Sequence, residues 1–331
     1  MTDQQDRATG LIWDERYLAH DTGAGHPERA DRLTAIREAL SAAGVIERCQ
    51  PLAPREATDA EILAVHSHEY LDRLRTTCAS GAPRIDCVDS AICPQSYEVA
   101  RFSAGGALAA VDAVMAGTVP NAFCAVRPPG HHCERDVSMG FCLLANVAIA
   151  ARHLRDRYKI ERVAIIDWDV HHGNGTQHLF EEDPSVYFCS LHGHPSYVYP
   201  GTGFPNERGT GAGKETTLNI PFYPGATDSD YRRAFDESVL PAMDQYKPQF
   251  VLISAGFDAH QRDPLAPIDL ETASYGWMTQ AVADIARRHA GGRLVSVLEG
   301  GYDLQALGES VALHVKELLA AANGVAAKMQ E

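Results

Sequence analysis

Residues 162–175 read RVAIIDWDVHHGNG, an apolar run that passes directly into a polar stretch rich in Asp and His. A short, uninterrupted run of apolar and β-branched residues is typical of a strand that is buried on both faces of a parallel sheet. Asp167, Asp169 and His171 follow it at every second position. Side chains two apart in extended chain lie on the same face. The stretch therefore predicts a central strand that carries three polar side chains at its carboxyl end.

Similar apolar runs alternate with segments of helical periodicity along the rest of the chain. We expect strands over 121–126, 162–166, 186–190, 250–254 and 293–298, and helices over 31–43, 103–115, 145–154, 231–243, 278–289 and 310–321. Buried strands that alternate with helices indicate an α/β fold in which helices cover both faces of a mostly parallel sheet, a three-layer sandwich. No internal repeat or linker composition interrupts the chain, which predicts a single domain over 1–331.

Four of these predicted strands end in chemically reactive residues. The strand at 121–126 is followed by RPPGHH (127–132), and the strand at 162–166 by DWDVHHGNG (167–175). The strands at 250–254 and 293–298 are followed by AGFD (255–258) and EGGY (299–302). Ligands of open α/β sheets bind beyond the carboxyl ends of the strands. We therefore expect the functional site at this edge of the sheet.

Three of these residues form a candidate metal site. Asp169 and His171 share one face of the chain after their strand, and Asp258 follows another strand. Two carboxylates and one imidazole leave a coordination position open for water, as a catalytic zinc site requires. The same oxygen-rich set also suits ferrous iron. The residues therefore predict a divalent metal more firmly than they predict which metal it is.

Charge and composition restrict the classes of partner. The 331 residues carry a formal net charge of −15 and are 45% hydrophobic. An acidic chain lacks the basic surface that phosphate binding needs, so nucleic acid is excluded as a partner. No apolar run has the length of a membrane span and the amino terminus has no signal-peptide pattern, so we expect a cytoplasmic protein without membrane contact. The sequence allows a homo-oligomer and does not determine the oligomeric state.

The eight cysteines predict neither disulfides nor a cysteine zinc site, because none forms a C-x-x-C pair and several lie in apolar runs. Cys133, next to the histidine pair, has two readings: a reactive thiol near an electropositive metal, or an inert buried one.

Five motifs in order resemble the histone deacetylase superfamily, especially its class II branch and bacterial homologues. They are RPPGHH (127–132), MGFC (139–142), DWDVHHGNGT (167–176), SAGFDAH (254–260) and LEGGYDL (298–304), and HDTGAGHPERADRL (20–33) resembles the family's first loop and helix. The superfamily also contains acetylpolyamine amidohydrolases. The resemblance implies the arginase/deacetylase-like fold and a zinc-dependent deacetylase or amidohydrolase that removes acetyl or related acyl groups from lysine-like amines. Its substrate is then an acylated amine or an acyl-lysine peptide.

The resemblance also implies catalytic roles. Asp169, His171 and Asp258 would bind zinc. His132 would be the general base and acid, a role that suits an imidazole near neutral pH. His131 would be held by Asp167 and stay largely protonated.

Two further catalytic positions come from the same resemblance. Asn174 stands where class I members have an aspartate; because an amide stabilises imidazolium less than a carboxylate does, His132 is expected to lose its proton more easily than His131. Tyr302 would donate its hydroxyl to the oxyanion of the tetrahedral intermediate.

The implied substrate passage involves a second group of residues. Phe141, next to Gly140 in the MGFC motif, and Tyr199 match the two aromatic walls of the family's acyl-lysine tunnel. Asp89 or Ser90 falls where the family holds the substrate backbone amide. Leu265 stands where polyamine-specific relatives can place a glutamate, and an apolar residue there favours acyl-lysine-like substrates.

A structural potassium ion is a further implication of the resemblance. Its ligands would be Asp167, Ser190 and the backbone of Asp169, His171 and Leu191.

Three alternatives to this function stay open. The first is an acylpolyamine or other small-amide hydrolase on the same scaffold. The second is a catalytically silent protein that binds acylated amines, although such a protein needs neither His132 nor Tyr302. The third, an arginase-like enzyme with two metals, needs more aspartates around 167–174 than the chain has.

Overall fold

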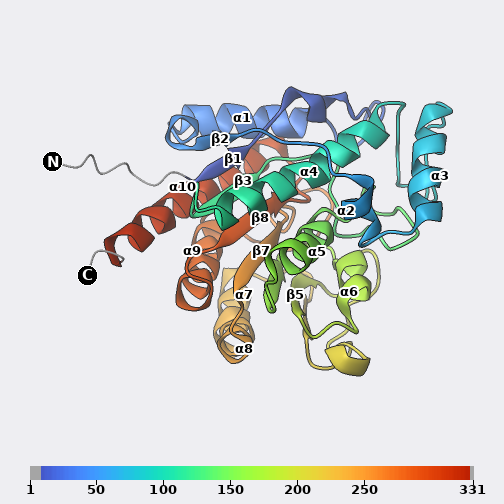
Figure 1. The fold of residues 1–331 in the computed structure, drawn as a ribbon. Helices are drawn as coiled ribbons and strands as arrows, with labels where there is room; N and C mark the ends of the chain where they lie inside the picture. The colour runs from blue at the N-terminus through green and yellow to red at the C-terminus, as the bar shows by residue number, and fades with distance from the viewer. Residues whose placement is uncertain (1–8, 329–331) are drawn as a thin grey trace.

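The central element of the fold is one sheet of eight parallel strands (Figure 1). This computed structural model describes residues 9–328, and every strand pairing in it is parallel. The strands are β1 (Gly10–Ile12), β2 (Gln50–Leu52), β3 (Asn121–Cys124), β4 (Val163–Asp167), β5 (Val186–Gly193), β6 (Thr217–Phe222), β7 (Phe250–Ala255) and β8 (Leu294–Leu298). Their order across the sheet is β2-β1-β3-β8-β7-β4-β5-β6. The α/β sandwich expected from the sequence is confirmed, with a wholly parallel sheet.

Helices cover both faces of this sheet. They are α1 (Asp31–Ala42), α2 (Asp59–Leu63), α3 (His68–Ala79), α4 (Ser96–Met115), α5 (Asn146–Tyr158), α6 (Asn174–Phe180), α7 (Asp228–Ala234), α8 (Leu240–Tyr246), α9 (Thr272–His289) and α10 (Leu304–Lys328). β3 is contacted by both α4 and α10, and β7 by both α5 and α9. α1, α10, α9 and α8 contact one another in succession, and so do α3, α4, α5 and α2. All five residues of β4 are fully buried, which explains its uninterrupted apolar sequence.

The sheet is wider than the sequence predicted. The five expected strands are present with ends shifted by at most three residues, but β1, β2 and β6 were missed. β1 and β2 have three residues each, and β2 is largely exposed at one edge of the sheet. β6, at the opposite edge, is partly exposed and contains Pro221. Short edge strands with proline lack the continuous apolar run that marks a central strand.

The expected helices are also present, and several begin earlier than periodicity indicated. α4 begins at Ser96 and not at residue 103, because its first turns carry polar side chains. The helix expected over 231–243 is divided: α7 passes through a π-helical turn at Phe235–Val239 into α8. Pro241 has no backbone N–H for a regular bond to the preceding turn, which accounts for the widened backbone there.

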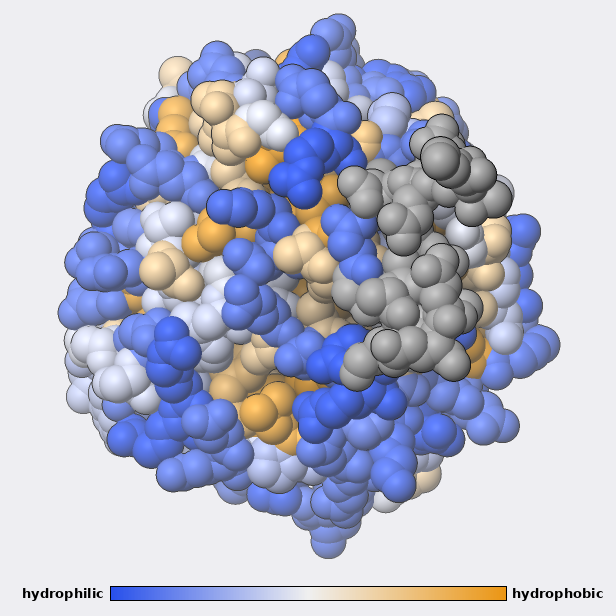
Figure 2. All heavy atoms as spheres, turned by 90° about the vertical axis from the view of Figure 1, so that its left-hand side faces the viewer, coloured by the Kyte–Doolittle hydropathy of each residue, from blue (hydrophilic) through white to orange (hydrophobic). Residues whose placement is uncertain are grey.

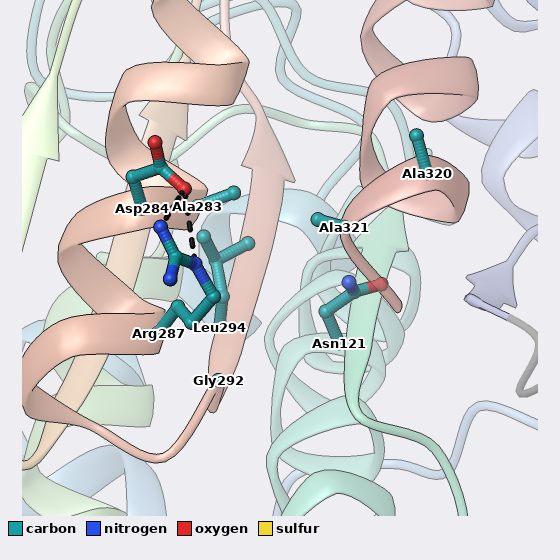
Figure 3. A pocket seen from close by; sticks show the side chains of 8 residues that line it. All are labelled: Asn121, Ala283, Asp284, Arg287, Gly292, Leu294, Ala320 and Ala321. Atoms are coloured by element: carbon teal, nitrogen blue, oxygen red, sulfur yellow. Dashed lines mark hydrogen bonds and ion pairs between the residues drawn. The ribbon is translucent and has the colours of Figure 1, made fainter. Parts of the chain in front are cut away.

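A cavity of about 220 Å³ lies at the amino-terminal ends of β3 and β8 (Figure 3). It is lined by Asn121, Leu294, small residues and the ion-paired Asp284 and Arg287 of α9. Figure 2 shows the left-hand side of the molecule as seen in Figure 1; outside the grey atoms it is largely hydrophilic, with small separate apolar patches. The lining of the cavity contains neither His nor Tyr, and its one Asp is paired with Arg287, unlike the group of His, Asp and Tyr side chains at the opposite ends of the strands. Within residues 9–328, no helix has the length and apolar character needed to cross a membrane.

Candidate active site

The site lies at the carboxyl ends of four adjacent central strands. β3, β8, β7 and β4 are consecutive in the sheet, and they lead into the loops that carry His131 and His132, Tyr302, Asp258, and Asp169 with His171. Because parallel strands end at the same edge, residues more than one hundred positions apart in sequence meet there. The sequence predicted these four strand ends without knowing that they were neighbours.

Asp169, His171 and Asp258 come together as a buried triad. One ligand atom of each lies within 4.8 Å of the other two. The Nδ1 atom of His171 is 3.1 Å from Asp169 Oδ1 and 3.0 Å from Asp258 Oδ2. Two buried carboxylates with only one imidazole between them carry an excess of negative charge, which is costly unless a cation balances it. The triad therefore fits a divalent metal ion.

Backbone hydrogen bonds hold the two carboxylates of the triad. The N–H of Val170 donates to Asp258 Oδ1 at 2.8 Å, and the N–H of Gly300 donates to Asp169 Oδ2 at 2.7 Å. A Cβ atom on Gly300 would collide with Asp258 Oδ2. Only glycine therefore allows the loop after β8 to close on the triad.

The pKa of His171 also supports a metal ion at the triad. Burial lowers the pKa of His171, but hydrogen bonds and charge from Asp169 and Asp258 outweigh it and raise that pKa to about 10. In this setting the imidazole carries the proton that partly neutralises the carboxylates. A bound metal ion would displace that proton, because a metal ligand must be deprotonated.

The two neighbouring histidines have opposite environments. His131 Nδ1 lies 3.0 Å from Asp167 Oδ2, and Asp167 and Asp169 overcome the effect of burial and raise the pKa of His131 to about 10. His132 Nδ1 lies 2.7 Å from Asn174 Oδ1. Burial, followed by the charges of His131 and His171, lowers the pKa of His132 well below its ordinary value. The two pKa values therefore differ in the direction expected from the sequence: His131 holds a proton more readily than His132 does.

Tyr302 lies on the loop between β8 and α10, opposite Phe141. The two ring centroids are 5.9 Å apart with the ring planes at 82°. Burial, then the charge of Asp258, raises the pKa of the Tyr302 hydroxyl well above its ordinary value, so the hydroxyl keeps its proton. Asp263 accepts a 2.7 Å hydrogen bond from the Tyr302 N–H, and Arg32 donates to the carbonyl of Gly301 at 2.7 Å.

Sequence reasoning missed the buried charges behind this loop. Glu28 forms ion pairs with both Arg32 and Arg127, and all three side chains are fully buried. Burial opposes ionisation of Glu28, but Arg127 prevails and lowers its pKa to about 2. Glu299 accepts hydrogen bonds from the N–H groups of Gly130 and His131. These four charged residues lie within the motifs quoted above, and this position was the sequence signal that could have revealed them.

The two aromatic residues expected to line a substrate passage lie beside the histidines and Tyr302. The ring of Tyr199 is 5.1 Å from the ring of His132, nearly perpendicular to it, and the residue is 41% exposed. Phe141 adopts a positive φ of 67°. Gly140, which precedes it, lies so close to the His132 ring that a Cβ atom would collide with it. Phe141 and Tyr199 thus stand next to the catalytic candidates with part of their surface open.

The remaining substrate candidates are placed differently from one another. Asp89 accepts a hydrogen bond from the Gly140 N–H at 3.2 Å, whereas Ser90 is fully buried. Of these two alternatives, Asp89 is the one with a hydrogen bond to the segment that precedes Phe141. Leu265 is 38% exposed, and its N–H donates to Asp263 Oδ1 at 3.0 Å. Leu265 therefore lies on the loop whose Asp263 side chain also accepts a hydrogen bond from the Tyr302 N–H.

The cysteines are free and mostly buried, as expected. Burial raises the pKa of the Cys133 thiol well above its ordinary range, which favours the inert reading.

Comparison with known proteins gives one consistent family. Residues 26–318 match the model of the histone deacetylase domain. The chain is 40% identical to the histone deacetylase-like amidohydrolase of Pseudomonas aeruginosa, over 89% of this chain and 82% of that protein. It is 41% identical to a probable deacetylase of Archaeoglobus fulgidus, over 90% of this chain and 82% of the relative.

Two further similarities bear on fold and substrate. The crystal structure of the HDA15 HD domain superposes with a TM-score of 0.90 at 41% identity, covering 95% of this chain and 90% of that one, which confirms the expected deacetylase-like fold. The human polyamine deacetylase HDAC10 is 38% identical over 94% of this chain, and the match spans 46% of its length.

Proposed function

This chain belongs to the histone deacetylase family and, like its relatives, is a hydrolase of acylated amines, and we propose that it uses zinc to remove acyl groups from lysine-like amines. The observation that carries the proposal is the meeting of a buried Asp-His-Asp triad, an unequal histidine pair and Tyr302 at one edge of the sheet. A protein that only bound acylated amines would need neither His132 nor Tyr302.

Asp169, His171 and Asp258 would hold the zinc ion. When bound there, zinc supplies Lewis acidity, which polarises the amide carbonyl and acidifies water. A potassium ion near Asp167 is a further part of the proposal, supported by the register of β4 and β5, which places Asp167 beside Ser190.

The two histidines then divide the proton chemistry. His132, neutral in its buried setting, takes a proton from the attacking water and later gives one to the departing amine. His131 stays charged through Asp167 and stabilises the negative charge that develops nearby. Tyr302 keeps its hydroxyl proton and donates a hydrogen bond to the oxyanion.

The substrate chain would lie between Phe141 and Tyr199. Each methylene buried there contributes about 0.8 kcal/mol, so an alkyl chain of lysine length gains affinity from both rings. Asp89, held by the Gly140 N–H, would accept a hydrogen bond from the amide of a peptide substrate. A polyamine substrate is the second candidate, and the similarity to a polyamine deacetylase is the observation that favours it.

A panel of acylated amines tests the proposal directly. The zinc-loaded protein is expected to hydrolyse acetyl-lysine peptides with a higher kcat/KM than acetylspermidine, with longer acyl chains measured in parallel. A wide preference for acetylspermidine would replace the lysine-like substrate by a polyamine. Failure to hydrolyse any member of the panel would contradict the enzymatic proposal itself.

Leu265→Glu is expected to shift the preference towards acetylpolyamines. A second cationic nitrogen must lose hydration near an apolar side chain, and that loss is costly without a carboxylate nearby. Competition between acetylspermidine and an acetyl-lysine peptide measures the shift as a ratio of kcat/KM values. Leu265→Gln is the matched control, because it has nearly the same shape but no charge. An equal shift in both variants, or none in the glutamate variant, would show that Leu265 does not contact the substrate.

A further inference from the structure

The side-chain amide of Asn174 lies between His132 and a carboxylate that has no role in the mechanism above. Asn174 Oδ1 is 2.7 Å from His132 Nδ1, and Asn174 Nδ2 donates to Glu134 Oε1 at 2.5 Å. Asn174 is almost fully buried, and the Glu134 side chain is 22% exposed. On its other side, Glu134 Oε1 is 2.8 Å from His178 Nδ1 at the surface. The four residues form one continuous polar connection from the surface to the base.

The donors and acceptors of these residues allow only one orientation of the Asn174 amide. An ionised carboxylate can only accept hydrogen bonds, so Glu134 must face the NH2 group of Asn174. The backbone carbonyl of His132, 3.3 Å from the same Nδ2 atom, is a second acceptor on that side. The oxygen of the Asn174 amide is thereby directed at His132 Nδ1. Because that oxygen only accepts, Nδ1 must carry the hydrogen, and the lone pair stays on Nε2.

We propose that Glu134 is a positioning residue, which fixes the tautomer of His132 by orienting the Asn174 amide. The inference rests on the proposed function, since only a base needs its lone pair on a defined nitrogen. An asparagine by itself can present either end of its amide to a neighbour. Glu134 removes that ambiguity, because the two ends of the amide differ only in whether they donate or accept.

Reversing the hydrogen-bonding character of residue 134 tests the proposal. The ammonium group of Glu134→Lys only donates, so it demands the oxygen of Asn174 and turns the NH2 group towards His132. His132 must then accept at Nδ1 and carry its hydrogen on Nε2, where it cannot act as a base. A fall in kcat of about 100-fold is expected, the lower range of general base catalysis, with KM changed less than about twofold. Glu134→Gln, whose own oxygen can still face Asn174, is expected to stay within about fivefold of the wild type.

A second substitution is expected to repair the first. Asn174→Asp can accept from the lysine ammonium and from His132 Nδ1 together, so the pair Glu134→Lys, Asn174→Asp should recover at least about tenfold of the lost kcat. Asn174→Asp alone places two carboxylates in contact and should lower kcat. Losses that simply multiply in the double variant would overturn the proposal. Asp136→Lys is the charge-matched control. The Asp136 side chain is exposed and accepts a hydrogen bond from Ser67 rather than from Asn174, so this variant should keep wild-type activity within about twofold.

The tautomer itself provides a readout that does not need a substrate. Imidazole ¹⁵N shifts of the zinc-loaded protein should show His132 protonated on Nδ1 in the wild type and in Glu134→Gln, and on Nε2 in Glu134→Lys. An unchanged tautomer in the lysine variant would overturn the proposal even if activity falls. If the wild type hydrolyses no acylated amine, the proposed function fails while this measurement still decides the role of Glu134. Should the lysine variant not fold, Glu134→Ala is expected to show a mixture of tautomers, and a single unchanged one would contradict the inference.

Discussion

Asp258→Ala is expected to yield a folded protein that holds no zinc and hydrolyses no acylated amine. The substitution leaves only Asp169 and His171 as protein ligands, fewer than the three that catalytic zinc sites normally use. It also removes the acceptor of the Val170 N–H, which helps to place the segment between the two remaining ligands. Elemental analysis after dialysis should give one zinc per wild-type chain and none in the variant, with activity lost in parallel.

Asp269→Ala is the matched control for this experiment. Asp269 lies on the same loop as Asp258, between β7 and α9, but it is exposed at the surface. The Asp269→Ala variant should therefore keep one zinc ion per chain and the wild-type activity. A full zinc complement in Asp258→Ala would contradict the assignment of this ligand, and two ions per wild-type chain would favour a two-metal enzyme.

Tyr302→Phe is expected to keep its zinc and to lose about 10²–10³-fold in kcat, the usual effect of removing one oxyanion donor. Only the hydroxyl is removed. The ring can still contact Phe141 and the Arg32 guanidinium, which lies 5.0 Å from its centroid, so the loop should keep its place. KM for an acetyl-lysine peptide should change little, because the lost hydrogen bond forms mainly in the transition state.

Tyr187→Phe removes a hydroxyl in the same way, from the amino-terminal part of β5 and away from the site. Its kcat should stay at the wild-type level. Near-full activity of Tyr302→Phe would show that another group stabilises the oxyanion. The zinc content separates the two site variants, because Asp258 is assigned as a ligand and Tyr302 only as a donor.

The central strands and the polar residues after them could be predicted because their signals are local. The apolar run at 163–166 is buried on both faces, and the alternation of Asp167, Asp169 and His171 follows from the geometry of extended chain. Edge strands such as β2 were missed for the converse reason. They bury little, so selection for apolar residues there is weak.

The tertiary structure alone decided which of these local features meet. Strand order brought Asp258 to the two residues that follow β4, and it placed Glu28 between two buried arginines that are 95 positions apart in sequence. The hydrogen bond of Asp89 to Gly140 and the contact of Glu134 with Asn174 also join segments that are distant in sequence. Hydrophobic periodicity shows which side of one helix or strand faces the core and which side faces solvent. Hydrogen bonds between distant segments leave no such repeat, because each depends on a single pair of side chains that only the packed sheet brings together.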